Sequence, residues 1–199
     1  MSREKSQFLS GFGVAFEIFK RIADAVLEQG GSDGDLRRVL SEEGLASGVA
    51  KLIVSSVRQS FRVLVDCTKS LAEMIQAGSY GYVNSDINSK NFKVEGQGRQ
   101  EVEVVLFHFK RAISIDDALR EMEKAGYRPA RIEELLALGA QYPDLQKQFP
   151  IVALGSMWQN PNGYCGVAFL GRVDAERKLS SDWIESDWSG GCRFVAVRK

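Results

Sequence analysis

Residues 151–199 read IVALGSMWQNPNGYCGVAFLGRVDAERKLSSDWIESDWSGGCRFVAVRK. Three apolar runs in this stretch, IVALGSMW, CGVAFLG and CRFVAVRK, are typical of strands, and turn-rich polar segments join them as loops. All three tryptophans of the chain, Trp158, Trp183 and Trp188, lie here. Small polar residues crowd between these rigid rings, a mixture typical of a recognition surface on a fixed scaffold. The stretch therefore predicts a C-terminal sheet whose loops bind a ligand.

Two further strands are predicted before this stretch. FRVLVD at 61–66 alternates apolar and polar residues, as a half-buried strand does. EVEVVLFHFKRAI at 101–113 has apolar residues on both faces, which predicts a central place in a sheet. The one histidine, His108, falls within this second strand. It is interpreted as a packed side chain, because a catalytic triad or a metal site needs partners that it does not have.

Helices are predicted between these strands. Residues 68–78 favour a short helix capped by Thr68, and residues 114–126 favour a helix capped by Ser114. A third helix is expected after Pro129. The order of strands and helices predicts an α+β domain of mixed topology.

The first 58 residues are interpreted as a separate helical segment, and residues 59–199 as the α+β domain. Residues 7–28 place phenylalanine and aliphatic residues three and four apart, which predicts an amphipathic helix with a phenylalanine-rich face. Glycines at 30 and 31 end this helix, and two more follow, the last over 43–56. The segment is too short for much of a core, so its apolar face is expected to pack on the rest of the chain or on a second copy.

The composition argues against several classes of function. The 199 residues include 26 Lys+Arg and 26 Asp+Glu, so the chain lacks the net positive charge typical of nucleic-acid-binding proteins. No apolar run reaches the roughly 20 residues that span a bilayer. The N-terminus lacks the pattern of a signal peptide. We therefore expect a cytoplasmic protein that binds neither nucleic acid nor membrane.

The three cysteines, Cys67, Cys165 and Cys192, lie at wide and irregular spacings. Such spacing fits neither a disulfide framework nor a zinc site, so free thiols are expected. No histidine lies near either C-terminal cysteine to activate it. We therefore expect no catalytic residue, no cofactor and no metal. One alternative stays open: Cys165 and Cys192 meet in space and bind a soft metal or pair.

Two Asp-Trp pairs, at 182–183 and 187–188, enclose a short segment. Each tryptophan is expected to anchor the segment in the core, where such a ring buries about 150 to 250 Å². The residues between the rings are the candidates for binding: Ile184, Glu185, Ser186 and Asp187.

The segment GYRPARIEELLALG at 126–139 resembles the entry to the core helix of C-type-lectin-like domains of the formylglycine-generating-enzyme kind. GGCRFVAVRK at the C-terminus resembles their closing strand. The resemblance covers residues 61–199 and implies two helices, small antiparallel sheets and long loops. Cys165 and Cys192 do not reproduce the cysteine pair of the formylglycine-generating enzymes, so their oxidase activity is not carried over. The segment 160–162, Asn-Pro-Asn, lacks the other ligands of a lectin calcium motif and is interpreted as a turn.

Within that fold, the C-terminal region resembles the variable proteins of diversity-generating retroelements, in which adenine-directed mutagenesis diversifies chosen codons. An Asn codon of the AAY type can become Ser, Gly, Asp, Tyr, Cys, Arg, Val, Ala, Ile or Phe among others, but never Trp, Lys, Glu, Gln or Met. The resemblance implies a diversified ligand surface made of residues that such a codon can reach: Tyr164, Phe169, Arg172, Val173, Asp174, Ser180, Asp182, Ile184, Asp187, Ser189 and Gly190.

These observations predict a non-enzymatic protein that displays a C-terminal loop surface to a protein or glycan ligand. Tyr164, Phe169 and Arg172 are expected to supply most of the binding energy. Two alternatives remain open. One is a metal- or thiol-dependent enzyme on a formylglycine-generating-enzyme-like fold, which uses Cys165 or Cys192. The other is an assembly protein that forms homo-oligomers through its N-terminal helices.

Overall fold

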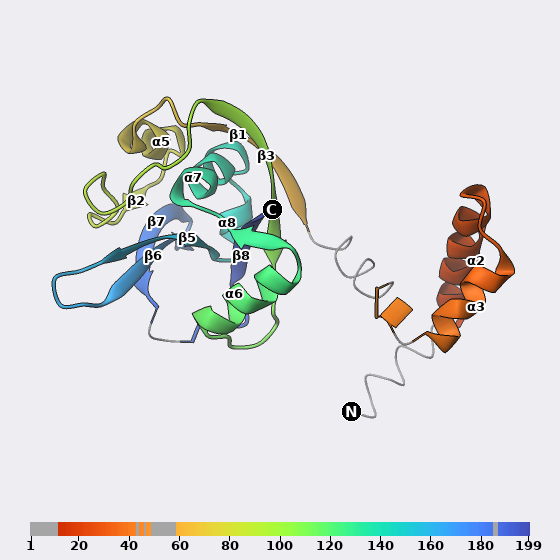
Figure 1. Cartoon of the computed structure of the whole chain (residues 1–199). Coiled ribbons are helices and arrows are strands. Elements are labelled where there is room, and N and C mark those ends of the chain that lie inside the picture. The colour runs from red at the N-terminus through yellow and green to blue at the C-terminus, as the bar shows by residue number, and fades with distance from the viewer. Residues whose placement is uncertain (1–11, 43, 46, 49–58, 185–186) are drawn as a thin grey trace. The chain divides into compact units, whose positions relative to one another are not determined.

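The computed structural model describes residues 12–42, 44–45, 47–48, 59–184 and 187–199 (Figure 1). The chain divides into two compact units, residues 1–57 and residues 58–199. The described part of the first unit is helical, and that of the second combines helices with a sheet. The expected α+β class is therefore confirmed.

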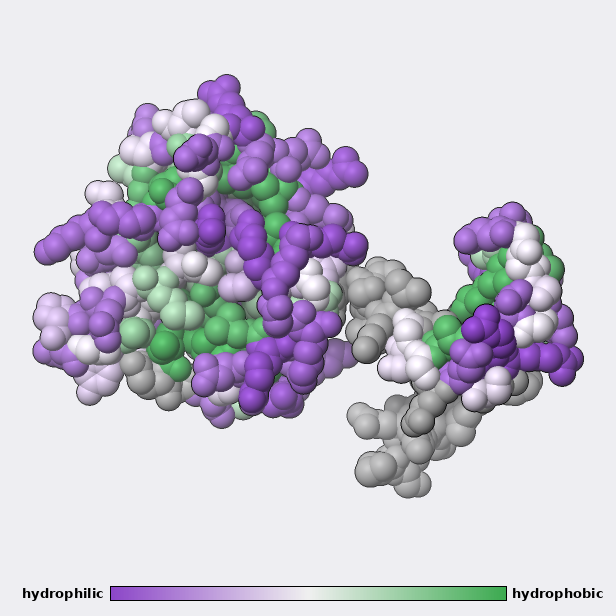
Figure 2. All heavy atoms as spheres, in the orientation of Figure 1, coloured by the Kyte–Doolittle hydropathy of each residue, from purple (hydrophilic) through white to green (hydrophobic). Residues whose placement is uncertain are grey.

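The helices described in the first unit are α2 (Phe12–Glu28) and α3 (Asp33–Ser41). Over α2, the helix expected from the phenylalanine spacing is confirmed. Gly30 follows this helix at φ 80°, a left-handed conformation that glycine adopts without strain. Phe16 and Phe19 are 60% and 58% exposed, and hydrophobic surface runs along this helix in Figure 2. The third predicted helix, over 43–56, lies mostly outside the described residues.

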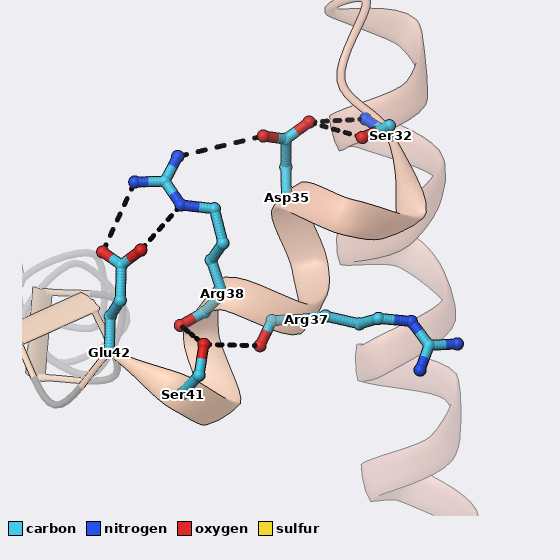
Figure 3. Close-up of polar contacts among 6 residues, drawn as sticks. All are labelled: Ser32, Asp35, Arg37, Arg38, Ser41 and Glu42. Carbon is cyan, nitrogen blue, oxygen red and sulfur yellow. Dashed lines mark hydrogen bonds and ion pairs between the residues drawn. The ribbon is translucent and has the colours of Figure 1, made fainter.

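Polar contacts link the two ends of α3 (Figure 3). Ser32, just before the helix, donates its backbone N–H and its hydroxyl to Asp35 at 2.9 and 2.7 Å. The Arg38 guanidinium lies 4.0 Å from Asp35 and 2.8 Å from Glu42. These side chains are about half exposed, so water screens their ion pairs. The hydrogen bonds of Ser32 define the start of the helix. The ion pairs of Arg38 contribute little to the free energy of unfolding.

The second unit is built on one sheet of eight strands, in the order β1-β3-β8-β5-β6-β7-β2, with β4 paired to β8 as well. Two pairs are parallel, β5 with β8 and β2 with β7. Because β3 lies between β1 and β8, its expected central place is confirmed. The strands are β1 (Ser60–Asp66), β2 (Tyr82–Val83), β3 (Arg99–Phe107), β4 (Tyr127–Pro129), β5 (Ile151–Gln159), β6 (Cys165–Val173), β7 (Glu176–Trp183) and β8 (Arg193–Arg198).

Helices cover both faces of this sheet (Figure 1). The α7 face carries α5 (Leu71–Ala77), α7 (Ile132–Gln141) and α8 (Leu145–Gln148), and the α6 face carries α6 (Ile115–Lys124). Alternate strand residues point to opposite faces, so each strand contributes to two cores. In β3, for example, Val104 packs in the α7 core and Val105 in the α6 core.

The helix caps agree with the sequence analysis in part. The Ser114 side chain accepts a backbone N–H from the first turn of α6 at 3.2 Å, which confirms the predicted cap. The cap of α5 is Ser70, which accepts the backbone N–H of Glu73 at 3.3 Å, so the assignment to Thr68 is wrong. Thr68 instead donates its hydroxyl to Asp66, in the turn that follows β1.

Other expectations are corrected by the structure. Residues 176–183 are not a loop but form β7, which pairs with β6. His108 is not packed in a strand, because β3 ends at Phe107 and the ring is exposed, with its Nε2 2.9 Å from the carbonyl oxygen of Gly190. The lectin-like details are not confirmed: the described part of this unit holds four helices on one large sheet, where two helices and small sheets are expected.

Candidate binding surface

A long hairpin, β6 with β7, carries most of the residues expected to bind. The two strands pair from Gly166 with Trp183 to Val173 with Glu176, and Asp174 forms the turn at φ 51°. At about 3.3 Å per residue, the nine residues of β6 span roughly 30 Å. Candidates near one end of the hairpin therefore cannot contact a small ligand together with those at the other end.

The register of the hairpin also separates the candidates by face. Phe169 pairs with Ser180 and Val167 pairs with Asp182. Because Val167 belongs to the α6 core, Phe169, Ser180 and Asp182 share the α6 face. Arg172 falls on the opposite face. Of the three expected hot-spot residues, the structure therefore places Phe169 and Arg172 on different sides of the sheet.

Phe169 is largely engaged in packing. Its ring lies 6.1 Å from that of Trp188, in an edge-to-face arrangement, and the Lys178 ammonium sits 5.1 Å from its centroid. Ile184 packs against the same core. Phe169 and Ile184 are therefore partly used for packing in the protein interior, which leaves less of each side chain for a ligand.

An aromatic cluster forms where β5, β6 and β7 end on the α7 face. It consists of Trp158 from β5, Trp183 from β7 and Tyr164 from the turn between β5 and β6. The Trp158 and Trp183 centroids are 5.9 Å apart, and those of Trp183 and Tyr164 are 6.1 Å apart. Tyr164 is 52% exposed and Trp183 39%, so the cluster opens to solvent. Only Tyr164 of this cluster was expected to bind.

The inner end of the aromatic cluster is fixed in the core. The Trp158 ring lies 6.5 Å from that of Phe92, which is 2% exposed. Gly166 lies between the two tryptophans, and a Cβ there would be 2.7 Å from Trp158 Nε1 and 3.4 Å from the Trp183 ring. The close approach of both rings therefore requires glycine at this position. Trp158 Nε1 is buried without a hydrogen-bond partner.

The turn that carries Tyr164 is held by its own hydrogen bonds. The Asn160 side-chain oxygen accepts the backbone N–H groups of Asn162 and Tyr164 at 2.9 and 3.0 Å. Gln159 donates its side-chain amide to the carbonyl oxygen of Gly163 at 2.8 Å. The interpretation of residues 160–162 as a turn is therefore confirmed. Tyr164 stands on a rigid support, which lowers the entropy lost when a ligand binds.

The two later tryptophans differ from expectation in one respect. Trp188 is 8% exposed and is an anchor, since it exchanges backbone hydrogen bonds of 2.9 and 3.0 Å with Ile113. Trp183 is not a buried anchor but a partly exposed member of the cluster. Trp183 and Asp182 are neighbours in β7, so their side chains point to opposite faces of the sheet. Which face Trp183 takes depends on the register of β7 with β6, and no local sequence pattern reveals that register.

The segment after Trp183 is pinned at its far end. A Cβ at Gly190 would lie 2.8 Å from the backbone nitrogen of Arg111, so the two chain segments touch there. Asp187 and Ser189 are exposed on either side of Trp188, and the Ser189 hydroxyl lies 3.5 Å from Cys192 Sγ. The predicted Glu185 and Ser186 lie outside the described residues.

The other end of the hairpin carries Arg172, Val173 and Asp174, all exposed. Arg177 ties this end to the helices, because its guanidinium donates to the carbonyl oxygens of Gly78 and Gly139 at 2.5 Å. The ring of Tyr80, stacked on that guanidinium, is largely buried, and the burial raises the pKa of its hydroxyl to about 12. This end is thus anchored by polar contacts, and its exposed residues form no aromatic cluster.

Cys67, Cys165 and Cys192 form no disulfide with one another. Ile151 of β5 pairs with Leu170 of β6 and with Arg193 of β8, which puts Cys192 near the level of Leu170. Cys165 lies at the start of β6, so at about 3.3 Å per residue the two thiols are at least roughly 15 Å apart. They do not meet. Burial, and next the negative charge of Glu133, raise the pKa of the Cys67 thiol, which disfavours the reactive thiolate.

Within the described ranges, no group of three His, Cys, Asp or Glu side chains could hold a metal ion. Over the same part of the chain, no helix is long and apolar enough to cross a membrane. Comparisons with protein-family models, curated proteins and solved structures found no match.

Proposed function

We propose that this chain is a non-enzymatic binding protein, and that its ligand, a protein or a glycan, contacts the aromatic cluster of Trp158, Tyr164 and Trp183. The observation that carries the proposal is the exposure of two large rings on a buried support. Tyr164 is 52% and Trp183 is 39% exposed, although both ring types gain free energy when covered. Trp and Tyr are also the residues most enriched at binding hot spots.

The exposed residues of the hairpin support a second part of the proposal, that the surface is diversified as in the variable proteins of diversity-generating retroelements. Residues that an AAY codon reaches include the exposed Tyr164, Arg172 and Asp182, whereas Trp188, which it cannot reach, is buried. A protein whose surface residues change while its fold stays the same needs its variable positions on the surface and its constant positions in the core.

The flanking DNA tests this second part. A near-copy of the codons for residues 157–193, differing almost only at adenines and lying beside a reverse-transcriptase gene, is the expected finding. A genome that holds no such copy would contradict diversification and leave the binding function in place.

Binding arrays test the first part. The full chain is labelled and applied to an array of glycans and to an array of folded proteins, beside its Trp183→Ala and Val173→Ala variants. We expect Trp183→Ala to weaken binding about tenfold or more, because a central aromatic residue is removed. Val173 is 52% exposed at the other end of the same hairpin, so Val173→Ala serves as the matched control.

Thermal unfolding of each variant separates lost binding from lost folding. The proposal predicts that Val173→Ala binds like the wild-type chain, and that Trp183→Ala remains folded with weaker binding. Equal losses in the two variants, or no binding to either array by the wild-type chain, would contradict it.

A further inference from the structure

We propose that the aromatic cluster is a stacking site for the apolar face of a neutral pyranose ring, so that the ligand is a glycan. This inference rests on the proposed binding function and names its ligand class. It is carried by three features of the cluster: the geometry of its rings, the chemistry of its surroundings and the area that it exposes.

The ring geometry suits a puckered, non-aromatic ligand. The Trp183 and Tyr164 rings are tilted by 54° at a centroid separation of 6.1 Å, and both side chains are partly exposed, so part of each stays open to a ligand. A pyranose carries several C–H bonds on one face. Their positive hydrogens are attracted to the negative face of an aromatic ring, as ring edges are in aromatic pairs. Phe92 and Trp158 fix the cluster from below, so it is formed before the ligand arrives.

The turn that carries Tyr164 is polar and uncharged. The turn from Gln159 to Tyr164 reads Gln-Asn-Pro-Asn-Gly-Tyr and contains no charged residue. Gln159 and Asn160 each use one side-chain atom to hold the turn, and Asn162 adds a third amide side chain. Amide groups both donate and accept hydrogen bonds, as the hydroxyl groups of a sugar require. Elsewhere in the described chain, cationic side chains occupy aromatic faces, as Arg177 does at Tyr80 and Lys178 does at Phe169.

The exposed area of the cluster is large enough for a contact with a sugar and is a small part of what a protein interface covers. An aromatic side chain buries about 150 to 250 Å² when fully covered. At 39% and 52% exposure, Trp183 and Tyr164 together offer about 200 Å² to a ligand. A stable protein interface buries about 800 Å² on each partner. The cluster alone is therefore the size of a contact with one or two sugar rings.

The first experiment uses the full chain and four methyl glycosides, those of glucose, galactose, mannose and N-acetylglucosamine, together with the glycan array. Saturation-transfer NMR reports which ligand protons touch the protein, and tryptophan fluorescence reports the affinity. We expect at least one sugar to bind in the millimolar range, with transfer strongest to the C–H protons of one ring face. Because the ligand is neutral, added salt should leave the affinity unchanged.

Three variants locate the contact. Trp183→Ala is expected to weaken sugar binding about tenfold or more, whereas Trp183→Phe keeps a ring and should stay within about threefold of the wild-type affinity. Met157→Ala is the control, because Met157 is 42% exposed on the same sheet but pairs with Val167 and so lies on the α6 face. Equal losses in Met157→Ala and Trp183→Ala would overturn the inference.

The outcomes separate this inference from the function on which it rests. If no glycoside and no arrayed glycan binds, while arrayed proteins are bound through Trp183, the glycan is wrong and the binding function stands. If neither array gives a ligand, both proposals fail. Sugar binding that is lost in Trp183→Ala and kept in Trp183→Phe supports both.

Discussion

Gly166 determines how closely the two tryptophans of the cluster can approach. Its missing side chain leaves room for Trp158 Nε1, which would lie 2.7 Å from an added Cβ. Trp158 therefore packs over the backbone of β6 from the β5 side of Gly166, and Trp183 approaches Gly166 from the β7 side. The cluster depends on this small residue as much as on its rings.

Gly166→Ala should therefore destabilise the protein by about 1 to 3 kcal/mol, the usual cost of overpacking. The free energy of unfolding is measured by urea denaturation, with tryptophan fluorescence as the probe. Gly191→Ala is the control, since a Cβ there would meet only the Ser189 hydroxyl, at 3.7 Å. If both variants are as stable as the wild-type chain, the packing described around Gly166 is wrong.

Single residues show where the sequence could not predict the site. Tyr164 was expected on the surface because it lies in an Asn- and Gly-rich turn, and the structure exposes it. Trp183 was expected in the core, as most tryptophans are highly buried. Its exposure follows from its position at the end of β7, opposite Gly166, and that pairing joins residues from two strands.

The edge strand β1 is covered by side chains from the C-terminal end of α7. Gln141 accepts the backbone N–H of Leu64 at 3.0 Å and donates to the carbonyl oxygen of the same residue at 2.9 Å. The Tyr142 hydroxyl donates to the carbonyl oxygen of Arg62 at 3.0 Å. These side chains occupy backbone groups that an edge strand otherwise offers to another chain.

Gln141→Ala should free these backbone groups of Leu64 and destabilise the protein by about 1 kcal/mol, the net contribution of a typical hydrogen bond. Amide hydrogen exchange followed by NMR is the measurement, and exchange at Leu64 should become faster. Gln148→Ala changes another exposed glutamine at the end of a helix, α8, and is the matched control. Unchanged exchange at Leu64 would show that the edge does not depend on Gln141.

Elements with a strong local pattern were predicted from the sequence, and elements defined by pairing were not. β1, β3, β5, β6 and β8 have apolar alternation or apolar runs, and each was expected near its observed place. β7, with the sequence ERKLSSDW, has only Leu179 buried. It is a strand because it pairs with β6, and such long-range pairing leaves little trace in a short polar segment.

The described residues form a helical unit and a larger α+β unit, and the two units expose different kinds of side chain. The helical unit exposes Phe16 and Phe19. The larger unit concentrates its exposed aromatic rings on Tyr164 and Trp183, at one end of the sheet, and on Tyr82, which pairs with Lys178 near the other end. The proposed function assigns the first of these sheet ends to ligand binding.

Chemical-shift mapping of a bound ligand on the full chain tests this assignment most directly. The ligand is one selected on the arrays, and the amide signals are followed as it is added. If the ligand binds at the aromatic cluster, the shifted amides should lie at residues 158–166 and 181–184. Shifts confined to residues 172–176, at the other end of the hairpin, or to α2, would contradict this assignment.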